Sequence, residues 1–409
     1  MTKKKLTVWV FQDGEFLPID SCQKKLRTWK LVENLRKHGH NIVWWASTFD
    51  HFNKKNRFSE DTSTLVEEGF EIRLLNCGSY KKNISFARLL HHVRLGKKLW
   101  QACNALDPKP DIIIASYPII EFSIVAEKIN KKFDIPFIID IRDLWPDTFK
   151  MLFPKWSGFL LDVAFLPYNR TIRKRFRTAQ KIVAINKSCL EWGLQKAQRL
   201  SDNLDQDIIY LGADEQEKSS ESIEKLDAIP KDKVIYSHLG SLGKLYEVEL
   251  ILEAAEILAK EKSNVHFVIA GNGIKKRLIE CRSSTLPNVT YLGWLNKDQC
   301  SAVMERTSVM LLMCKNLALP NKFYDAGFYH KPMIVSSLGA TEEIIIEPNI
   351  RELYEHGNVS SFIIAVKNLL SLDKREKMSA HFEKLYKEKY NHETIYSKYV
   401  SLIEQAAGL

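Results

Sequence analysis

Residues 265–276 read VHFVIAGNGIKK, and this stretch decides the fold. A run of mainly apolar residues ends in a Gly-x-Gly loop, and lysines follow where a helix is expected to begin. A continuous apolar run predicts a strand that is buried on both faces, which is typical of parallel sheets covered by helices. The stretch therefore predicts one strand–loop–helix unit of a doubly wound sheet.

The same pattern recurs along the chain. Residues 234–244, VIYSHLGSLGK, form a second such junction, and the apolar residues 309–313 run into a third. In the first half, apolar runs alternate with segments that carry apolar residues at helical spacing. These runs are 6–11, 41–46, 111–116 and 136–141. We therefore expect a second parallel sheet in the first half of the chain.

The length of 409 residues favours two domains. We predict an α/β fold in which two Rossmann-like doubly wound domains face each other across a cleft. The N-terminal domain is placed at 1–200 and the C-terminal domain at 201–385, with a polar segment at 212–233 in or beside the hinge region. A terminal helix at 386–409 is expected to pack back towards the N-terminal domain.

Composition narrows the class of protein. The seven cysteines are scattered and form no C-x-x-C pair, which argues against a disulfide framework and a zinc site. The apolar run near the N-terminus has only about six residues, too few for a signal peptide or a membrane span, so a cytoplasmic protein is expected. The formal net charge of +10 favours nucleic acid, anionic lipid or phosphorylated small molecules as partners.

The three junctions of the second half are expected to meet at one sheet edge. Ligands of open α/β sheets bind beyond the carboxyl ends of the strands, where glycines let backbone N–H groups approach a phosphate. The alternative at each junction is an ordinary tight turn with a solvated lysine. Lys276 stands where the dinucleotide fingerprint has its third glycine. The candidate binding residues in these loops are Gly240, Ser241, Lys244, Gly271, Gly273, Asn321 and Lys322.

Residues 320–332, PNKFYDAGFYHKP, place Lys322 and Asp325 three positions apart in a short helix. An ionised carboxylate accepts two hydrogen bonds, so Asp325 fits the paired hydroxyls of a ribose while Lys322 lies near the phosphates. The alternative is an i,i+3 surface ion pair, which contributes only about 0.2–0.5 kcal/mol.

The order of 240-GSLGK-244, 271-GNGIKK-276 and 320-PNKFYDAGFYHKP-332 resembles the C-terminal half of bacterial family 4 glycosyltransferases. In the first half, 110-PDIIIAS-116 and 138-IIDIRDLWPD-147 are similar to the same group, in particular to enzymes of O-antigen and capsule assembly. The resemblance implies the GT-B fold, with a nucleotide-sugar donor held mainly by the C-terminal domain and the acceptor by the N-terminal domain. It also implies retaining transfer of a hexosyl or N-acetylhexosaminyl group without a metal or another cofactor.

The sequence departs from this family at several positions. The second of the family's two glutamates aligns with Asp325, but the first aligns with Leu317, which cannot hydrogen-bond a sugar. The family's arginine and lysine in the first loop fall at Ser241 and Tyr246, so Lys244 and Lys322 would supply the positive charge. The glycine before the Lys-Pro exit is replaced by His330.

In the N-terminal half, Arg142 and Asp143 follow a predicted strand and are the candidate catalytic residues, orienting the acceptor. The alternative is a structural ion pair between the two. Asp140 and Asp143 come nearest to a metal-binding carboxylate pair, and no metal site is expected. Gly14 follows the first strand, where family members often carry a glycine-rich loop that approaches the donor diphosphate.

Two basic stretches, 79–106 and 169–181, contain no acid, and the apolar stretch 156–168 precedes the second. Basic and apolar helices together are typical of a membrane interface, so we expect a peripheral enzyme on the inner face of the plasma membrane that takes a lipid-linked sugar acceptor. The alternative is that 156–168 packs in the core and the basic residues are solvated. The basic residues are Lys81, Lys82, Arg88, Arg94, Lys97, Lys98, Arg170, Arg173, Lys174, Arg175, Arg177 and Lys181.

Two other functions remain open. A nucleotide-sugar 2-epimerase of the same fold would bind the donor in a similar way but would need no acceptor. A nucleic-acid-binding protein would use the basic stretches, but the sequence contains no recognised nucleic-acid module, and no nucleic-acid partner is expected.

Overall fold

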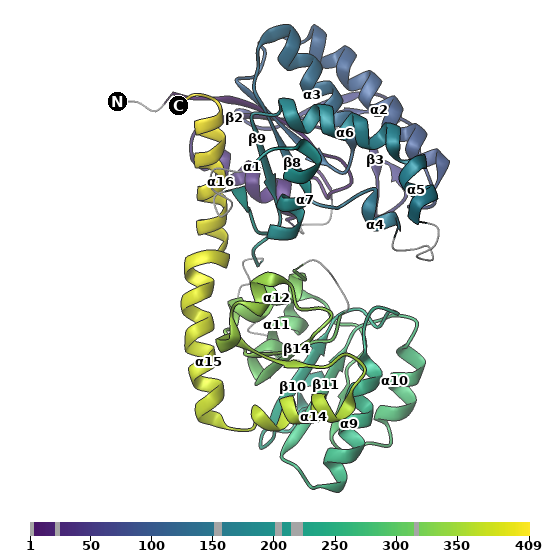
Figure 1. Ribbon diagram of the computed structural model, residues 1–409, viewed down its shortest axis with the longest axis vertical. Helices are drawn as coiled ribbons and strands as arrows, with labels where there is room; N and C mark the ends of the chain where they lie inside the picture. Colours follow the sequence, from purple (N-terminus) through teal and green to yellow (C-terminus); the bar gives the residue numbers. More distant parts are fainter. Residues whose placement is uncertain (1–3, 21–24, 151–157, 201–206, 214–223, 315–318) are drawn as a thin grey trace. The chain divides into compact units, whose positions relative to one another are not determined.

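The computed structural model describes residues 4–20, 25–150, 158–200, 207–213, 224–314 and 319–409. The chain divides into two compact units (Figure 1). Unit 1 consists of Met1–Tyr210 together with Ile395–Leu409, and unit 2 consists of Leu211–Thr394. The sequence analysis set the corresponding boundaries after residues 200 and 385.

Unit 1 is built on a seven-stranded sheet in the order β5-β6-β2-β1-β7-β8-β9. The strands from β6 to β9 pair in parallel, whereas β5 runs antiparallel to β6 at the edge. The strands are β1 (Thr7–Phe11), β2 (Asn41–Ser47), β5 (Thr62–Glu67), β6 (Phe70–Leu75), β7 (Ile112–Tyr117), β8 (Phe137–Ile141) and β9 (Lys181–Ala184). A separate antiparallel pair joins β3 (Phe49–Asp50) to β4 (Lys55–Asn56).

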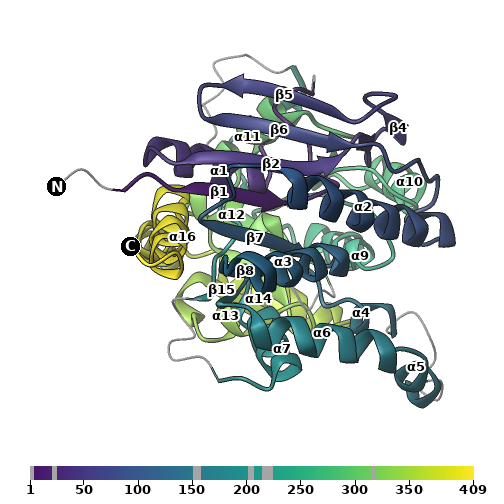
Figure 2. The ribbon, with the colours of Figure 1, turned by 90° about the horizontal axis from the view of Figure 1, so that it is seen from above.

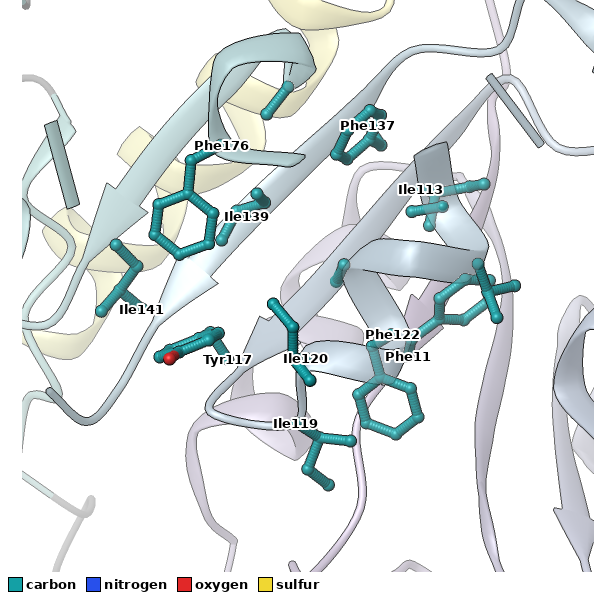
Figure 3. Close-up of a cluster of buried hydrophobic side chains, with 14 of the residues drawn as sticks. Phe11, Ile113, Tyr117, Ile119, Ile120, Phe122, Phe137, Ile139, Ile141 and Phe176 are labelled. Atoms are coloured by element: carbon teal, nitrogen blue, oxygen red, sulfur yellow. The ribbon is translucent and has the colours of Figure 1, made fainter. Parts of the chain in front are cut away.

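Helices cover both faces of this sheet (Figure 2). Strand β1 shows why, because Trp9 and Phe11 point into one buried cluster while Val8 and Val10 point into the other. Figure 3 shows the first cluster, where Phe11 packs beside Phe122. The first face is covered by α2 (Phe86–Ala105), α3 (Ile120–Phe133), α6 (Leu166–Thr178) and α7 (Lys187–Ala197), and the second by α1 (Arg27–Lys37) and α16 (His392–Ala406). Two short helices, α4 (Asp147–Lys150) and α5 (Gly158–Ala164), lie between β8 and α6 in the chain.

Unit 2 is built on a six-stranded parallel sheet in the order β12-β11-β10-β13-β14-β15. Its strands are β10 (Val234–Leu239), β11 (Val265–Ala270), β12 (Val289–Tyr291), β13 (Val309–Leu312), β14 (Met333–Ser336) and β15 (Arg351–Tyr354). Its α-helices are α9 (Val248–Lys260), α10 (Lys276–Ser283), α11 (Lys297–Arg306), α12 (Asn321–Phe328), α13 (Glu342–Ile345), α14 (Val359–Asn368) and α15 (Leu372–Leu385). Shorter helical turns are η2 (Glu224–Ala228), η3 (Pro348–Ile350) and the π-helical η4 (Tyr386–Tyr390).

The predicted α/β class with two parallel sheets is confirmed. Strands β10 and β11 are buried at every position, as the continuous apolar runs indicated. Strands β5, β9 and β15 and the β3–β4 pair were not predicted. Strand β4 and most of β5 are exposed, so no apolar run marks them in the sequence.

Candidate functional site

The carboxyl edge of the unit 2 sheet brings the first two glycine loops together. Strand β10 lies next to β11, and the loop that follows β10 pairs with the loop that follows β11. Leu242 N donates to Asn272 O at 3.0 Å, and Lys275 N donates to Leu242 O at 3.1 Å. The strand pairing therefore continues into the loops and holds them as one rigid platform.

Gly271 and Gly273 are required by the packing of these loops. Both have positive φ values, +145° and +159°. A Cβ atom at Gly271 would lie 1.7 Å from Gly240 O, and one at Gly273 would lie 2.6 Å from Leu242 O. Any side chain at either position would force the two backbones apart, so the glycines shape the platform whether or not they also approach a ligand.

Helix α12 adds the third junction, because β13 is the other neighbour of β10. Pro320 occupies the N-cap and the helix begins at Asn321, which is exposed. Lys322 Cε lies 3.9 Å from the position of a Cβ at Gly240, and Lys322 Nζ lies 3.1 Å from Asp325 Oδ2. The structure therefore brings Gly240, Lys322 and Asp325 together.

The Lys322–Asp325 pair is partly accessible, with 34% and 21% of the two side chains exposed. Burial lowers the pKa of Lys322, but the charge and hydrogen bond of Asp325, together with Cys300 and Tyr246, outweigh burial, and the pKa of Lys322 lies above its ordinary value. Lys322 is therefore a permanent cation beside the glycine platform. The i,i+3 pair that the sequence left as an alternative is present, and it leaves both groups open to a ligand.

The other lysines of the edge are placed differently. Lys275 Nζ donates to Tyr246 O at 2.5 Å and pairs with Glu249 Oε2 at 2.7 Å, so it ties the loop to α9. Lys276 lies 3.5 Å from Glu280 on its own helix. Ser241 and Lys244 are exposed. Of the lysines at these junctions, Lys322 is the one that lies against Gly240.

Two buried side chains at this edge escaped the sequence analysis. His238 near the end of β10 has its Nε2 atom 3.4 Å from Ser241 O, and burial lowers its pKa to about 4, so the ring is neutral. Glu247 accepts hydrogen bonds from Tyr354 Oη at 2.9 Å and Gly357 N at 2.8 Å. Because its partners come from far along the chain, no local pattern marks Glu247. It fixes the ends of β14 and β15 to the start of α9.

Arg142 and Asp143 are separated in unit 1. Arg142 pairs with Asp140 at 2.9 Å and with Glu15, rather than with Asp143 as the structural alternative supposed. Asp143 is exposed and accepts a hydrogen bond from Thr148 Oγ1 at 2.9 Å. The reason is the direction of the strand: Asp140 points to the same side as Arg142, two residues on.

Asp140 lies at the centre of a buried charge network. It is fully buried and also accepts two hydrogen bonds from Arg27, at 2.9 and 3.0 Å. Burial raises the pKa of Asp140, but Arg27 and Arg142 outweigh burial and hold the pKa below its ordinary value. Asp140 is therefore a structural carboxylate.

Gly14 lies in the turn that follows β1, with φ of +82°, and a Cβ there would lie 3.9 Å from His51. Leu317 lies outside the described residues. Among the residues that are described, no group of three His, Cys, Asp or Glu side chains could hold a metal ion. None of the described helices is long and apolar enough to cross a membrane.

Residues 219–385 match the family model described as Glycosyl transferases group 1. No curated protein matches the sequence. Among solved structures, the sucrose-phosphate synthase from Thermosynechococcus elongatus is similar with a TM-score of 0.68, at 14% identity over 98% of this chain and 99% of that chain. The Anabaena protein HepE in complex with UDP and glucose has a TM-score of 0.59, at 13% identity over 98% and 100% of the two chains.

Two further solved structures share the fold. The lipopolysaccharide outer core galactosyltransferase WaaB has a TM-score of 0.60, at 14% identity over 98% of this chain and 99% of that chain. A UDP-N-acetylglucosamine 2-epimerase has a TM-score of 0.53, at 15% identity over 92% and 91%. At these identities the likeness shows the fold. The chain therefore has an α/β fold of the GT-B type, and its residues 219–385 match the group 1 glycosyltransferase model.

Proposed function

We propose that this protein is a retaining glycosyltransferase that moves a hexosyl or N-acetylhexosaminyl group from a nucleotide-diphosphate sugar to a lipid-linked glycan acceptor. The product would be a surface polysaccharide, such as a lipopolysaccharide O-antigen or a capsule. The observation that carries the proposal is the convergence of Gly240, Lys322 and Asp325 at one sheet edge, inside the segment that matches the group 1 glycosyltransferase model.

The donor is assigned to unit 2 because its groups match the parts of a nucleotide sugar. Lys322 neutralises the diphosphate, and each charge-assisted hydrogen bond of this kind contributes about 1.5–3 kcal/mol. Asp325 accepts hydrogen bonds from the ribose hydroxyls. The backbone of the two glycine loops approaches the phosphates closely at Gly240, Ser241, Gly271 and Gly273. Lys244 and Asn321 lie at the margin of this donor site. HepE, which shares the fold, has been crystallised with UDP and with UDP-glucose.

The proposed catalysis is positioning and charge stabilisation. The leaving diphosphate gains charge as the glycosidic bond breaks, and Lys322 lies where it lowers the energy of that charge. The attacking hydroxyl is deprotonated with the help of the leaving diphosphate on the same face of the sugar, so no protein nucleophile and no cofactor are required. In unit 1, Arg142, Asp143 and Gly14 are proposed to help hold the acceptor and the donor diphosphate. The buried ion pairs of Arg142 favour a positioning role for that residue.

A thermal-shift screen of the purified protein against UDP, GDP, ADP, CMP and NAD tests the donor assignment. One nucleoside diphosphate is expected to raise the melting temperature, because a ligand that binds only the folded state stabilises that state. The matching nucleotide sugar should then be consumed only when an acceptor is added. A screen in which none of the five compounds shifts the transition would remove the donor assignment.

The 2-epimerase alternative is favoured by one observation, the shared fold of the UDP-N-acetylglucosamine 2-epimerase. The same screen cannot separate the two functions, because both bind a nucleotide sugar. Conversion of the nucleotide sugar without any acceptor would establish the epimerase. For the nucleic-acid alternative, a gel-shift measurement at physiological salt is expected to show no specific binding.

The membrane part of the proposal is supported by helix α5. Over Gly158–Ala164 the core-packing alternative finds no support, since α5 buries none of its side chains, whereas Tyr168 at the end of the stretch packs against the core. Phe159, Leu160 and Val163 are 76%, 62% and 55% exposed. Apolar side chains beside the basic helix α6 fit a peripheral protein at the inner face of the plasma membrane.

A further inference from the structure

A cluster of cations in unit 1 takes no part in the proposed donor site. The β3–β4 pair and the start of α2 meet around Tyr80, which is 5% exposed. Lys54 Nζ lies 5.1 Å and Arg88 Cζ 5.7 Å from the centroid of the Tyr80 ring. The Tyr80 hydroxyl lies 2.7 Å from His51 Nδ1, at hydrogen-bonding distance. Three basic side chains therefore converge on one aromatic ring.

The positive charge of this cluster meets no direct ion-pair partner within the described residues. Within the described part of the chain, neither Lys54 nor Arg88 forms an ion pair; both donate instead to Asn83, at 2.6 and 2.8 Å. Arg88 Nε is buried and lacks a hydrogen-bond partner among the same residues.

The acids of this region are already engaged. Asp13 accepts hydrogen bonds from Ser47 N and Ser47 Oγ at 2.8 Å and faces His91, with Asp13 Oδ2 3.6 Å from His91 Nε2. Asp50 accepts hydrogen bonds from the backbone N–H groups of Phe52 and Asn53, both at 2.9 Å. Asp13 and Asp50 therefore act on the cations around Tyr80 through their charges alone, and within the described residues no carboxylate forms an ion pair with Lys54 or Arg88.

The electrostatics agree with an anion site at this cluster. Burial and the Arg88 charge lower the pKa of Lys54, and the opposing Asp50 charge offsets only part of this effect. Burial, Lys54 and Arg88 lower the pKa of His51 by more than Asp13 and Asp50 raise it. Burial and Arg88 lower the pKa of the neighbouring His92 to about 4. Cations that depress one another in this way are relieved when an anion binds between them.

The position of the cluster is that of a ligand site. Gly14 follows β1, Phe49 follows β2, and Tyr80 comes after the end of β6, so the cluster lies beyond the carboxyl ends of three adjacent parallel strands. Ligands of open α/β sheets bind at this edge.

An apolar surface lies directly beside the cations. The first turns of α2 expose Phe86 by 78%, Leu89 by 52% and Val93 by 51%. Arg88 belongs to the same turns. A cationic cluster next to exposed apolar side chains matches a ligand that carries a phosphate at the end of a hydrocarbon chain.

We propose that Lys54, Arg88 and His51 form a phosphate-binding site in unit 1, and that the first turns of α2 receive the hydrocarbon chain of a lipid phosphate. The assignment of this lipid phosphate as the glycosyl acceptor rests on the proposed function. The phosphate site itself rests on the geometry around Tyr80 and stands apart from the donor site of unit 2.

The test measures calorimetric binding of inorganic pyrophosphate and of farnesyl diphosphate to the full chain. All proteins carry Lys322→Met, so that unit 2 contributes little to the signal. Arg88→Gln and Lys54→Gln are each expected to weaken pyrophosphate binding about tenfold or more, because each removes a charge-assisted contact. The matched control is Lys97→Gln, which removes one charge from an exposed position of the same helix and should change the affinity less than about twofold.

Two outcomes would overturn the phosphate site: no saturable binding of pyrophosphate, or an equal loss in the Arg88, Lys54 and Lys97 variants. The hydrocarbon part is tested by Phe86→Ser with Leu89→Ser, which should weaken farnesyl diphosphate binding and spare pyrophosphate. Equal affinity of the two probes in the parent protein would exclude a lipid source and leave a soluble phosphate. The nucleotide screen uses the chain with Lys322 intact, so failure of the donor site is recognised separately.

Discussion

A substitution at Asp325 tests whether the start of α12 binds a nucleotide or only carries an ion pair. If it holds the ribose, Asp325→Asn should remove the preference of the protein for a nucleoside diphosphate over its 2′-deoxy analogue. Loss of a hydrogen bond to a charged group corresponds to about 1.5–3 kcal/mol, which is a change of about tenfold to a hundredfold in affinity. Titration calorimetry with both nucleotides measures this change in affinity.

The comparison of ribose with deoxyribose matters because Lys322 loses its partner in this variant. A released lysine can bind the diphosphate more tightly, and that gain would mask a loss at the ribose. Glu253→Gln, an exposed position of α9, removes one negative charge from the same unit and should leave the preference unchanged. If the variant still prefers the ribose form as strongly as the parent protein, Asp325 does not contact the sugar.

His330 occupies a backbone position that suits glycine. It ends α12 with φ of +54°, and Lys331 N closes the helix by donating to Ala326 O at 2.8 Å. The left-handed conformation costs a residue with a Cβ about 1–2 kcal/mol, so His330→Gly should raise the free energy of unfolding by about 1 kcal/mol. Urea unfolding measures the change. His330→Ala keeps the Cβ and should give no such gain, and equal stability of the Gly and Ala variants would contradict the explanation.

The interaction partners of a residue can be predicted when they lie close to it in the sequence. The proximity of Lys322 to Asp325 follows from helical spacing alone. The steric reason for Gly271 does not, because the atom that excludes a side chain is Gly240 O on a neighbouring strand. For the same reason the partners of Arg142 could not be read from its neighbour Asp143, since Glu15 is distant in the sequence.

At the scale of elements, burial on both faces explains which strands were predictable. Strand β11 carries a continuous apolar run because helices cover both of its faces, whereas β5 has one neighbouring strand and a mostly exposed surface. Helix α5 shows the converse case. Its apolar residues fit either a membrane interface or a core helix by composition, and the structure shows Phe159, Leu160 and Val163 exposed.

Helix α5 yields a prediction about membrane binding. Replacing Phe159 and Leu160 together by serine should reduce co-flotation with vesicles that contain anionic phosphatidylglycerol, because it removes apolar area that enters the interface. The free energy lost is about 1.5–3 kcal/mol for each side chain that is fully buried in the membrane.

The control for this experiment is Ile364→Ser, which changes an apolar residue that is 60% exposed in unit 2. It should leave flotation unchanged. Binding that requires anionic lipid but does not depend on Phe159 and Leu160 would assign the membrane contact to the basic residues alone. Absence of flotation for the parent protein would end the membrane proposal.

For the molecule as a whole, the two parallel sheets were predictable because the strand–loop–helix pattern repeats in both halves. It was harder to argue from the sequence which of the two units the last residues of the chain join. Residues 395–409 belong to unit 1, where Tyr396, Tyr399 and Ile403 are buried in the core on the α1 face. Tyr399 also lies against Arg27, with the guanidinium 5.4 Å from the ring centroid. The end of the chain is therefore part of the same structure as the Asp140 network.

That network makes the stability of unit 1 depend on pH. The pKa of Asp140 is lower in the folded protein than in the unfolded chain, so its stabilising contribution is complete above the unfolded value of about 3.9 and is lost as the pH falls through the folded value. Asp140→Asn leaves Arg27 buried without its carboxylate partner and should cost about 3–5 kcal/mol at neutral pH. This deficit should shrink below about pH 4, where the unfolded chain takes up a proton at Asp140 while the folded protein still holds the carboxylate ionised. Urea unfolding followed from neutral pH to below pH 4 measures the deficit. The control is Asp373→Asn, which removes one partner of an exposed ion pair in unit 2. A deficit that stays constant to the lowest pH would show that the carboxylate charge does not hold Arg27 in place.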